Sequence, residues 1–530
     1  MANKNTTLSS HIKQFFATLT DDEKILALAE NIQQALEKGH TAIKLIHENN
    51  LKPDIITHDG KSGYIVFKDK QAAFRRFYHF EQNIKKAFID YKQQKIEQKK
   101  LQTAIKNVIT WSNLTIQDEI DWQWQACLSA LFNNRLVLDG GPGTGKTTTI
   151  VRLLMLYIQL YPDNKIMLAA PTGKAANRMT QSINQNLINL NCPQEITNKL
   201  QIQAKTIHRL LAFNPKTNIL TFNRNKPLPY DLVIIDESSM LDVSLANALI
   251  NAMKDNSNLV LIGDKNQLPA VDAGNVFADL CQILEPHNQQ QNILQKILNA
   301  KEDNFPIPNY VKLIKNYRFQ QDSIIANLCD SLIAKDCTKF KSYKINPDFH
   351  WHNPQNRQEK SKKLNLWLQN IPKQESYMIL CATNNGENSV NELNDIAKQL
   401  TNNTQELKQD APIIVTKNDY NLDVYNGDMS YLEQQNDKWY ATFNIEGKQQ
   451  RIQIQALNWQ IAHAISIHKA QGSEYDHVLI TLNENTEHKL TNALLYTAIS
   501  RAKKTISLWA SERLIEKIIL NQEKRLTFLK

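Results

Sequence analysis

Short apolar segments alternate with helix-forming stretches along most of the chain. The segments "RLVLD", "KIMLAA", "DLVIID" and "NLVLIGD" each end where polar or glycine-rich residues begin. This alternation is typical of a parallel α/β sheet, in which ligands bind at the carboxyl ends of the strands. A later set, "YMILCA", "HVLITL" and "TISLWA", repeats the pattern. The sequence therefore predicts two α/β domains in tandem.

Two other regions have a different pattern. Residues 1–110 are strongly charged and read as mostly helical, with an amphipathic stretch over Phe74–Gln102, which predicts a helical N-terminal domain with a structural or docking role. The segment Asp437–Leu457 alternates with a period of two around a Glu-Gly turn, as a β-hairpin does. We expect a small β-barrel inserted at about 403–459. The two α/β domains are then expected over 111–297 and 298–530.

Composition excludes only a few classes of protein. The chain has 530 residues and a formal charge of +9, which favours an anionic partner without identifying one. Its six cysteines are scattered, and no pair has the CxxC spacing of a zinc or redox site. The sequence contains no run of apolar residues long enough to span a bilayer, and its N-terminus lacks the apolar core of a secretion signal. We therefore expect a cytoplasmic protein with reduced thiols and no membrane partner.

The segment "GGPGTGKTT" follows the strand "RLVLD" directly and leads into a helix. Its spacing matches G-x-x-x-x-G-K-[ST], in which glycines let backbone N–H groups approach phosphate oxygens at a helix N-terminus. Lys146 is expected to reach the β- and γ-phosphates, and Thr147 to hold Mg²⁺. The residues expected to contact the nucleotide are Gly140, Gly141, Pro142, Gly143, Thr144, Gly145, Lys146, Thr147 and Thr148.

Later segments supply the remaining chemistry of phosphoryl transfer. After "DLVIID", Asp236 is placed to hold Mg²⁺ and Glu237 to polarise the attacking water, although an Asp-Glu pair could also be a helix cap. Gln267, in "GDKNQLP", could order that water or sense the γ-phosphate; alone it would be a surface amide. Arg318 in "NYRF" and Arg501 in "YTAISRAK" are candidates for arginines delivered from a second domain. Each arginine alone would more often be a surface or salt-bridged residue, but the two together predict a site closed between domains.

The order of these motifs resembles the superfamily 1 helicase series. "APTGKAA", "TIHRLL" and "SIHKAQGSEYD" complete the match, which runs from about Gln123 to Lys503. The segments "IDWQWQACLSAL", "TGKAANRM" and "KNDYNLDVYNGD" resemble the corresponding segments of the RecD family, the alpha subunits of exodeoxyribonuclease V in RecBCD-type complexes. The N-terminal segment "IVFKDKQAAFRRFYHFEQNIKKAF" also resembles these subunits, so the likeness covers nearly the whole chain.

The resemblance implies an ATP- and Mg²⁺-dependent motor that moves 5′ to 3′ on single-stranded DNA. It implies two RecA-like domains, an SH3-like barrel, RecB- and RecC-type partner subunits, and a role in double-strand break repair by recombination and in degradation of linear DNA. The nuclease of such a complex is expected in another subunit. Gln123, or as the alternative Gln125, matches the glutamine that reads adenine, and the QxxA spacing to Ala126 favours Gln123.

The resemblance also places single-stranded DNA and duplex ends across the tops of both α/β domains. Hydroxyls and amides there grip phosphates without reading bases. Ser466 departs from many relatives, which have Thr, and either histidine of the set could instead be a packing or capping residue. Residues 212–228 occupy the place of a hairpin that splits the duplex. The residues expected at DNA are Pro171, Thr172, Lys174, Thr206, His208, Ser466, His468, Gln471 and Ser473.

Several alternatives remain open. The tripeptide "DYK" at Asp90–Lys92 also occurs at the nuclease metal site of RecB-type subunits, but we expect it within the charged helix of 74–102, without the further carboxylates that a nuclease needs. The chain could be a stand-alone RecD-like or conjugative helicase, although those relatives usually carry a longer N-terminal extension or a relaxase domain. It could be a silent scaffold, although the retained Lys146 and Glu237 disfavour this. Finally, the N-terminal domain could contact DNA directly.

Overall fold

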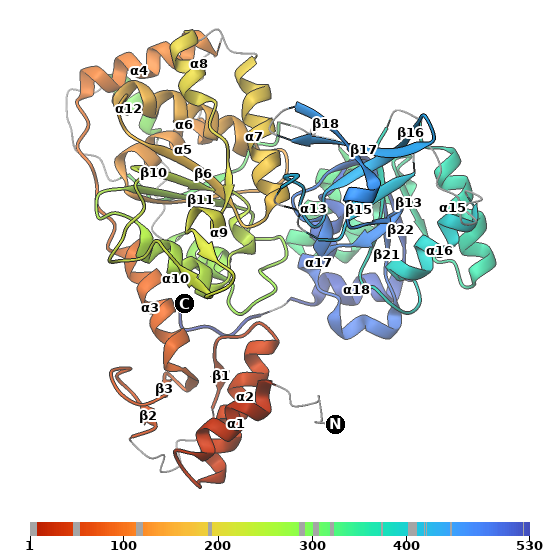
Figure 1. The fold of residues 1–530 in the computed structure, drawn as a ribbon, viewed down its shortest axis with the longest axis horizontal. Coiled ribbons are helices and arrows are strands. Elements are labelled where there is room, and N and C mark those ends of the chain that lie inside the picture. Colours follow the sequence, from red (N-terminus) through yellow and green to blue (C-terminus); the bar gives the residue numbers. More distant parts are fainter. Residues whose placement is uncertain are drawn as a thin grey trace.

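The computed structural model shows two α/β domains side by side, with a smaller N-terminal domain attached to the first (Figure 1). An antiparallel sheet is inserted in the second α/β domain. Within the described residues, no helix is both long and apolar enough to cross a membrane. The structure describes residues 8–45, 54–112, 120–188, 193–285, 292–299, 307–317, 323–372, 375–400, 411–417, 419, 421–445, 448–522 and 524–530.

The first α/β domain is built on a six-stranded sheet with the order β12-β5-β11-β10-β6-β7. Every pairing in it is parallel, which confirms the prediction from the apolar segments. The central strands are buried along their whole length, as expected for strands covered on both faces. The strands are β5 (Arg135–Gly140), β6 (Ile166–Ala170), β7 (Lys205–Thr206), β10 (Leu232–Ile235), β11 (Asn258–Gly263) and β12 (Tyr310–Leu313).

Helices cover both faces of this sheet. Leu136, Leu138 and Leu168 face one helical layer, whereas Val137, Met167 and Val233 face the other. The first layer contains α4 (Gln98–Trp111), α5 (Trp122–Phe132), α6 (Lys146–Leu160), α7 (Gly173–Ile188), α8 (Gln194–Leu200) and α12 (Ile293–Asn299). The second contains α3 (Arg75–Ile89), α9 (Ile207–Leu210), α10 (Val243–Ala252) and α11 (Val276–Leu284). The core of this domain therefore includes α4, which precedes residue 111.

The edge strand β12 corrects one expected assignment. Residues from 298 onward were expected in the second α/β domain, but Tyr310–Leu313 pairs in parallel with Val137–Gly140 of β5. Tyr310 and Val311 are buried in the two cores of the first domain. Strand β12 therefore belongs to the first sheet, and the second α/β domain begins only after it.

The second α/β domain contains a five-stranded parallel sheet with the order β13-β22-β21-β14-β20. Its strands are β13 (Phe349–His352), β14 (Tyr377–Cys381), β20 (Ala464–Ser466), β21 (Tyr475–Thr481) and β22 (Ala502–Trp509). One face is covered by α13 (Ile324–Ala334), α14 (Cys337–Ser342), α17 (Asn492–Ile499) and α18 (Glu512–Leu520). The other is covered by α15 (Arg357–Gln369) and α16 (Val390–Leu400). Short 3₁₀ turns occur at η1 (Ser238–Met240), η3 (Tyr343–Ile345), η4 (Ile454–Ala456), η5 (His468–Ala470) and η6 (Glu484–Lys489).

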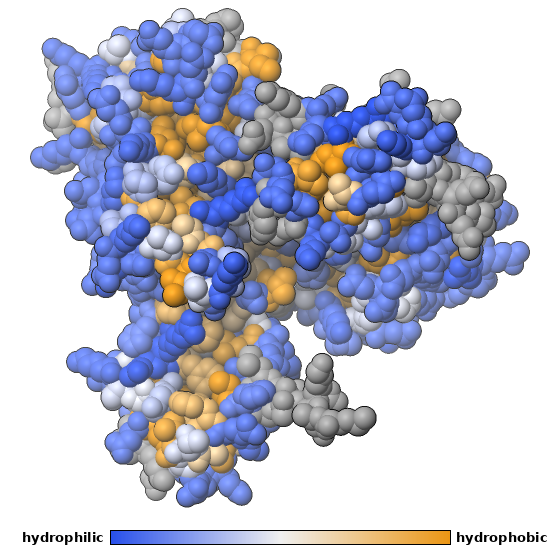
Figure 2. Space-filling view, viewed as in Figure 1, coloured by the Kyte–Doolittle hydropathy of each residue, from blue (hydrophilic) through white to orange (hydrophobic). Residues whose placement is uncertain are grey.

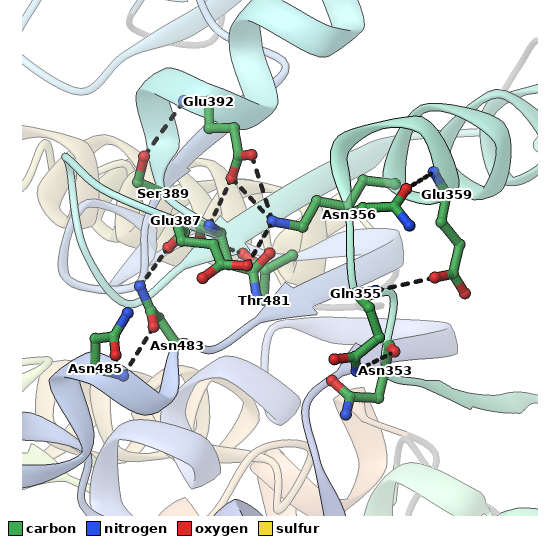
Figure 3. Close-up of polar contacts among 12 residues, drawn as sticks. Asn353, Gln355, Asn356, Glu359, Glu387, Ser389, Glu392, Thr481, Asn483 and Asn485 are labelled. Atoms are coloured by element: carbon green, nitrogen blue, oxygen red, sulfur yellow. Dashed lines mark hydrogen bonds and ion pairs between the residues drawn. The ribbon is translucent and has the colours of Figure 1, made fainter.

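A buried charge fixes the loop that follows β14. Lys360 of α15 is 2% exposed, and its Nζ lies 3.1 Å from Glu387 and 3.3 Å from Glu392. Figure 3 shows these two glutamates converging, while Asn483 after β21 donates to the backbone oxygen of Glu387. A buried ammonium needs such pairing to offset its desolvation. The network holds together the carboxyl ends of two neighbouring strands.

The inserted region is a five-stranded antiparallel sheet with the order β18-β17-β16-β15-β19. The predicted hairpin is confirmed, because β17 pairs antiparallel with β18; its turn at 446–447 lies outside the described residues. The pairings among the described residues leave β18 and β19 as the two ends of an open sheet, so they do not confirm a closed SH3-like barrel. The strands are β15 (Pro412–Val415), β16 (Met429–Gln435), β17 (Lys438–Ile445), β18 (Lys448–Gln453) and β19 (Trp459–Ile461).

The N-terminal domain contains a small sheet as well as helices, so the prediction of a helical domain is not confirmed. Helices α1 (Leu8–Ala17) and α2 (Glu23–Glu37) pack against a four-stranded sheet of β1 (Ile43–Lys44), β4 (Gln71–Phe74), β3 (Ile65–Lys68) and β2 (Ile56–Thr57). Asp69 and Lys70 have φ of 51° and 59° and form the two-residue turn between β3 and β4. The two-residue turn therefore forms a β-hairpin here, although the charged composition is typical of a helix.

The expected helix over 74–102 is also interrupted. Helix α3 ends at Ile89 and α4 begins at Gln98. Asp90 is the C-cap of α3, and Gln93 forms an isolated β-bridge with Asn133 of the first α/β domain. The tripeptide at Asp90–Lys92 thus lies in the connection after a helix rather than within one, because this connection pairs with the first domain.

The C-terminal segment returns to the N-terminal domain. Thr41 donates to Glu81 Oε1 at 2.6 Å, and the backbone N–H of Phe528 donates to Oε2 at 2.8 Å. Thr527 donates to the nearby Asp279 at 2.9 Å. Burial, with the charge of Asp279, raises the pKa of Glu81 to about 8. Between the ordinary carboxyl pKa and this value the folded chain retains a proton that the unfolded chain releases, so stability falls as pH rises through that window.

Replacing the acid should remove this pH dependence. Glu81→Gln keeps an acceptor for Phe528 and can donate to Thr41, whose hydroxyl can turn to the backbone oxygen of Leu526. We expect its melting temperature to exceed that of the wild type at pH 8, with the difference shrinking toward pH 5. Thermal unfolding followed by circular dichroism measures this. The exposed Glu37→Gln is the control; a difference for Glu81→Gln that stays constant with pH would contradict the assignment.

Candidate active site

The phosphate-binding loop connects β5 to α6, with Gly143 and Gly145 at φ of 75° and 82°. A Cβ at Gly145 would lie 2.1 Å from Nε2 of Gln123, so the position requires glycine in both conformation and space. The loop wraps one side of a cavity of about 390 Å³. Lys146 Nζ lies over the loop and donates to the backbone oxygens of Gly140 at 2.7 Å and Gly141 at 3.2 Å. A polyphosphate fits this cradle of backbone N–H groups at a helix N-terminus.

Two carboxylates face the loop across the cavity. Asp236 follows β10 and accepts the N–H of Glu237 at 2.8 Å. Burial and the neighbouring Glu237 raise the pKa of Asp236 to about 6, against the effect of Lys146. Glu237 has a left-handed backbone, with φ of 51°, which is uncommon for a residue with a side chain and is found at functional sites. This turn presents its carboxylate beside Asp236 rather than continuing the strand.

The donor set fits Mg²⁺ held jointly with a nucleotide. The part of the chain that the structure describes contains no group of three or more His, Cys, Asp or Glu side chains placed to hold a metal. Thr147 and Asp236 line the same cavity. Mg²⁺ is commonly bound by one or two protein oxygens together with phosphates and waters. The cavity therefore suits a magnesium nucleotide better than a metal cage made by the protein alone.

Gln267 lies where the two α/β domains meet. Its Nε2 donates to Asp264 at 3.2 Å, and the same carboxylate oxygen accepts the hydroxyl of Tyr496 from α17 at 2.9 Å. The N–H of Leu268 donates to Thr497 of α17 at 2.9 Å. Gln267 also lines the nucleotide cavity. The loop after β11 thus contacts both the cavity and the second domain.

Arg501 reaches the cavity from the second α/β domain. It is 3% exposed, and its guanidinium donates to the backbone oxygens of Thr497 at 3.0 Å and Ser473 at 3.4 Å. It lines the cavity together with Lys146 and Glu237. The structure therefore brings this arginine to the P-loop across the domain junction.

Arg318 lies outside the described residues. The residues before it are placed: Tyr317 donates its N–H to the backbone oxygen of Gly143 at 2.8 Å, and Asn316 donates to that of Pro142 at 3.0 Å. These contacts attach the segment after β12 to the P-loop. The residues just before it, Asn316 and Tyr317, are thus attached to the first domain, whereas this segment was expected in the second.

The sequence analysis missed several residues of the cavity, among them one aromatic residue and one ion pair. Tyr317 is 55% exposed and presents an aromatic ring at the cavity wall. Arg178 of α7 forms an ion pair with Glu474, which comes from the second domain. Tyr317 could have been found from the sequence, because it is an aromatic residue directly before Arg318. The ion pair could not, because its two partners are far apart in the sequence.

The structure distinguishes the two candidate glutamines. Asp121 caps α5 by accepting the N–H of Gln123, whose side chain donates to the backbone oxygen of Thr144 in the P-loop at 3.3 Å. Gln125 instead accepts the N–H of Ile293 at 3.4 Å, in the helical layer. Only Gln123 is therefore in contact with the P-loop.

The residues expected at DNA in the first domain follow β6 and β7. Lys174 donates to the backbone oxygen of Gly427 in the inserted region at 3.2 Å, and burial lowers its pKa to about 8. Thr206 caps α9 by accepting the N–H of Arg209. His208 is exposed, with its ring edge-on to Phe213. The neighbouring Pro171 and Thr172 are partly exposed.

The corresponding residues in the second domain follow β20. His468 is exposed, whereas Ser466, Gln471 and Ser473 are buried. Gln471 donates to the backbone oxygen of Leu268 at 3.3 Å, across the domain junction. The second set therefore lies against the loop that also carries Gln267.

A short hairpin projects from the first domain within 212–228. Strand β8 (Phe213–Asn214) pairs antiparallel with β9 (Ile219–Leu220), and Asn223 and Lys226 form a further bridge. Ile219 is 61% exposed. The segment thus presents an apolar side chain to solvent.

Comparisons with known proteins agree with this geometry. Residues 123–273 match an AAA domain family, and residues 461–508 match the UvrD-like helicase C-terminal domain family. A solved structure of Bacteroides Pif1 bound to ssDNA covers 76% of this chain and 94% of that chain, at 18% identity and a TM-score of 0.41, a likeness too distant to bear on function.

Two curated relatives match over most of their length. The RecBCD enzyme subunit RecD of Buchnera aphidicola is 28% identical over 522 residues, which is 90% of this chain and 86% of that protein. The subunit of the same name from Haemophilus influenzae is 31% identical over 465 residues, which is 77% of this chain and 72% of that protein. With this identity over more than two thirds of the Haemophilus protein, the chain belongs to the RecD family of superfamily 1 helicases.

Proposed function

We propose that this chain is an ATP-dependent 5′-to-3′ DNA helicase that serves, with RecB- and RecC-type subunits, as the RecD subunit of exodeoxyribonuclease V in the cytoplasm. It would act in double-strand break repair by recombination and in degradation of linear DNA. The observation that carries this proposal is the shared cavity in which Arg501 of one α/β domain meets Lys146 and Glu237 of the other. An ATPase closed between two domains can convert hydrolysis into relative movement.

Each side chain has a distinct task in hydrolysis. Thr147 and Asp236 would hold Mg²⁺, which neutralises charge on the phosphates when bound. Lys146 would turn from the P-loop carbonyls toward the β- and γ-phosphates. Glu237 would accept a proton from the attacking water, and Gln267 would orient that water. Those roles follow from the side chains facing one cavity.

Arg501, with Arg318, would stabilise the charge on the transferred phosphate. An arginine supplied in this way raises turnover by roughly 10³- to 10⁵-fold in other NTPases. Because Arg501 belongs to the second domain, its contact with the phosphate exists only while the domains are closed. Hydrolysis would then release one domain from the other, and the DNA contacts of the two domains would alternate in strength.

The N-terminal domain supports a role as the docking module for partners. Phe15 and Tyr64 are 47% and 42% exposed, and a groove of about 1350 Å³ lies between this domain and the first α/β domain. Figure 2 shows apolar surface on the N-terminal domain and along this junction. Contiguous apolar surface of this kind marks protein interaction sites. Direct DNA contact by this domain is the alternative.

Two other functions are less well supported. A silent scaffold would not need the P-loop, carboxylates and arginine to converge on one cavity. A stand-alone helicase would use the same cavity, so association with partners decides between them. We place the nuclease of the complex in another subunit, and we treat the tripeptide at Asp90–Lys92 as a coincidence.

Tailed duplexes test direction and motor activity together. We expect the full chain, alone and with RecB- and RecC-type subunits, to hydrolyse ATP faster with single-stranded DNA and to unwind 5′-tailed duplexes in preference to 3′-tailed ones. Lys146→Gln should reduce turnover by at least about 100-fold, the typical cost of losing a transition-state contact. In the complex, the same substitution isolates the contribution of this subunit.

The possible outcomes separate the alternatives. Preference of the isolated chain for a 3′ tail would overturn the direction. Absence of stimulation by single-stranded DNA would contradict the motor. Activity without co-purification of the partner subunits would favour the stand-alone helicase.

The hairpin should matter for unwinding and not for hydrolysis. If β8 and β9 split the duplex, Ile219→Ala removes apolar contact with the terminal base pair. We expect slower unwinding at an unchanged rate of DNA-stimulated ATP turnover. Ile345→Ala, at a site 93% exposed in the second domain, is the matched control. Equal losses for both variants, or a loss confined to turnover, would show that the hairpin has another role.

Gln123 should determine the choice of base. A glutamine amide can pair with N6 and N7 of adenine, and such a bidentate contact contributes about 1–3 kcal/mol of discrimination. We expect Gln123→Ala to lower the ratio of kcat/KM for ATP over GTP by roughly 5- to 150-fold. Gln125→Ala, whose side chain contacts Ile293 instead, should leave the ratio unchanged. If kcat/KM fell for both ATP and GTP while their ratio stayed constant, Gln123 would have no part in base recognition.

A further inference from the structure

The ion pair between Arg178 and Glu474 crosses from one α/β domain to the other inside the nucleotide cavity. Arg178 lies on α7 of the first domain, and Glu474 lies between β20 and β21 of the second. Both side chains line the cavity with Asp236 and Glu237. They are 35% and 14% exposed. The pair is therefore partly shielded from water, which makes its strength sensitive to neighbouring charge.

Arg178 is held by acids from both domains. Burial acts to lower its pKa, but Glu474 first, and then Glu237 and Asp236, raise it above the ordinary value. The guanidinium thus interacts with the two carboxylates assigned to hydrolysis as well as with its partner in the second domain. A magnesium nucleotide in the cavity would change the charge that Arg178 experiences from its own domain.

Each member of the pair also adjoins a residue expected at DNA. Arg178 lies four residues after Lys174 on α7, so the two side chains are neighbours on one face of the helix. Glu474 directly follows Ser473, whose backbone oxygen accepts from Arg501. A displacement of either DNA-contacting segment would therefore move one end of the ion pair.

We propose that Arg178 and Glu474 are positioning residues that couple DNA binding to the nucleotide site. Their ion pair transmits a shift of the second domain on DNA to Asp236 and Glu237, and transmits nucleotide binding back to the DNA contacts. This inference rests on the proposed helicase function. It assigns to the pair the coupling between the sites rather than a direct contact with phosphate.

The test measures coupling in both directions with the full chain. The first readout is the ratio of ATP turnover with and without oligo(dT). The second is the affinity for fluorescent oligo(dT), measured by anisotropy with and without a non-hydrolysable ATP analogue. Coupling between binding sites is reciprocal and typically amounts to roughly 5- to 150-fold. We expect Arg178→Gln and Glu474→Gln each to reduce both effects by at least about fivefold.

A double-mutant cycle shows whether the two residues act as a pair. Removing either partner already breaks the contact, so the Arg178→Gln/Glu474→Gln chain should lose no more coupling than the single variants. Arg178→Lys, which keeps the charge, should retain part of the coupling. Losses that multiply in the double variant would show independent roles and overturn the proposal.

Asp423→Asn is the matched control. Asp423 lies 3.6 Å from Arg209, and this pair also joins the first domain to the inserted region, but neither residue lines the nucleotide cavity. We expect the control to keep both couplings. An equal loss of coupling in Asp423→Asn would show that any contact between the domains has this effect, and would overturn the specific role of the pair. Full coupling in the Arg178 and Glu474 variants would also overturn it. A wild type that DNA does not stimulate would instead overturn the helicase function itself.

Discussion

The placement of the second domain's site residues depends on one buried contact between the two α/β domains, centred on Asp264. This carboxylate is 1% exposed and accepts from Gln267 of its own domain and from Tyr496 of the other. A buried carboxylate must be satisfied by hydrogen bonds, so the tyrosine cannot be withdrawn without cost. The contact fixes α17 against the loop after β11. Because Arg501 lies two residues beyond the end of α17, the same contact helps to set the distance from this arginine to the P-loop.

The cavity beside this contact is balanced in charge. Lys146, Arg178 and Arg501 face three carboxylates, those of Asp236, Glu237 and Glu474. Partly buried ions are tolerated when they are paired, and removing one leaves the other uncompensated. A polyphosphate bound here would disturb this balance, since it would compete for the cations and any Mg²⁺ bound with it would add positive charge. Nucleotide binding would therefore change the pairing of charges across the domain junction.

The sequence was most informative where function requires contiguous residues. Phosphate binding needs backbone N–H groups from one loop, so the residues from Gly140 to Thr148 could be recognised from spacing alone. Parallel strands were recognisable because burial on both faces leaves continuous apolar runs. The N-terminal sheet was missed because its strands are only two to four residues long, too short for an alternating pattern. The sheet that β12 joins could not be inferred, because an apolar run does not specify its neighbour.

The long-range features of the site had no comparable signal. Arg178 and Glu474 meet only because two separately folded domains pack in one orientation, and neither residue has a local reason to be paired. The same holds for the antiparallel insertion, where the hairpin of β17 and β18 follows from local alternation but the closure of a barrel depends on contacts between distant strands. Local chemistry was thus predictable, whereas the geometry between domains was not.

The C-terminal segment limits how the domain junction can open. Helix α18 of the second domain ends at Leu520, and Arg525 is already anchored, donating to the backbone oxygens of Asp272 and Gly274 in the first domain. The five Cα–Cα steps from Leu520 to Arg525 can span at most about 18 Å when fully extended. The following residues are tied to His40 of the N-terminal domain and to Glu81 of α3. The segment therefore limits how far the two sheets can separate on this side. A domain movement that rotates about this side would change the contacts of Arg501 and Glu474 while the N-terminal domain stays in place.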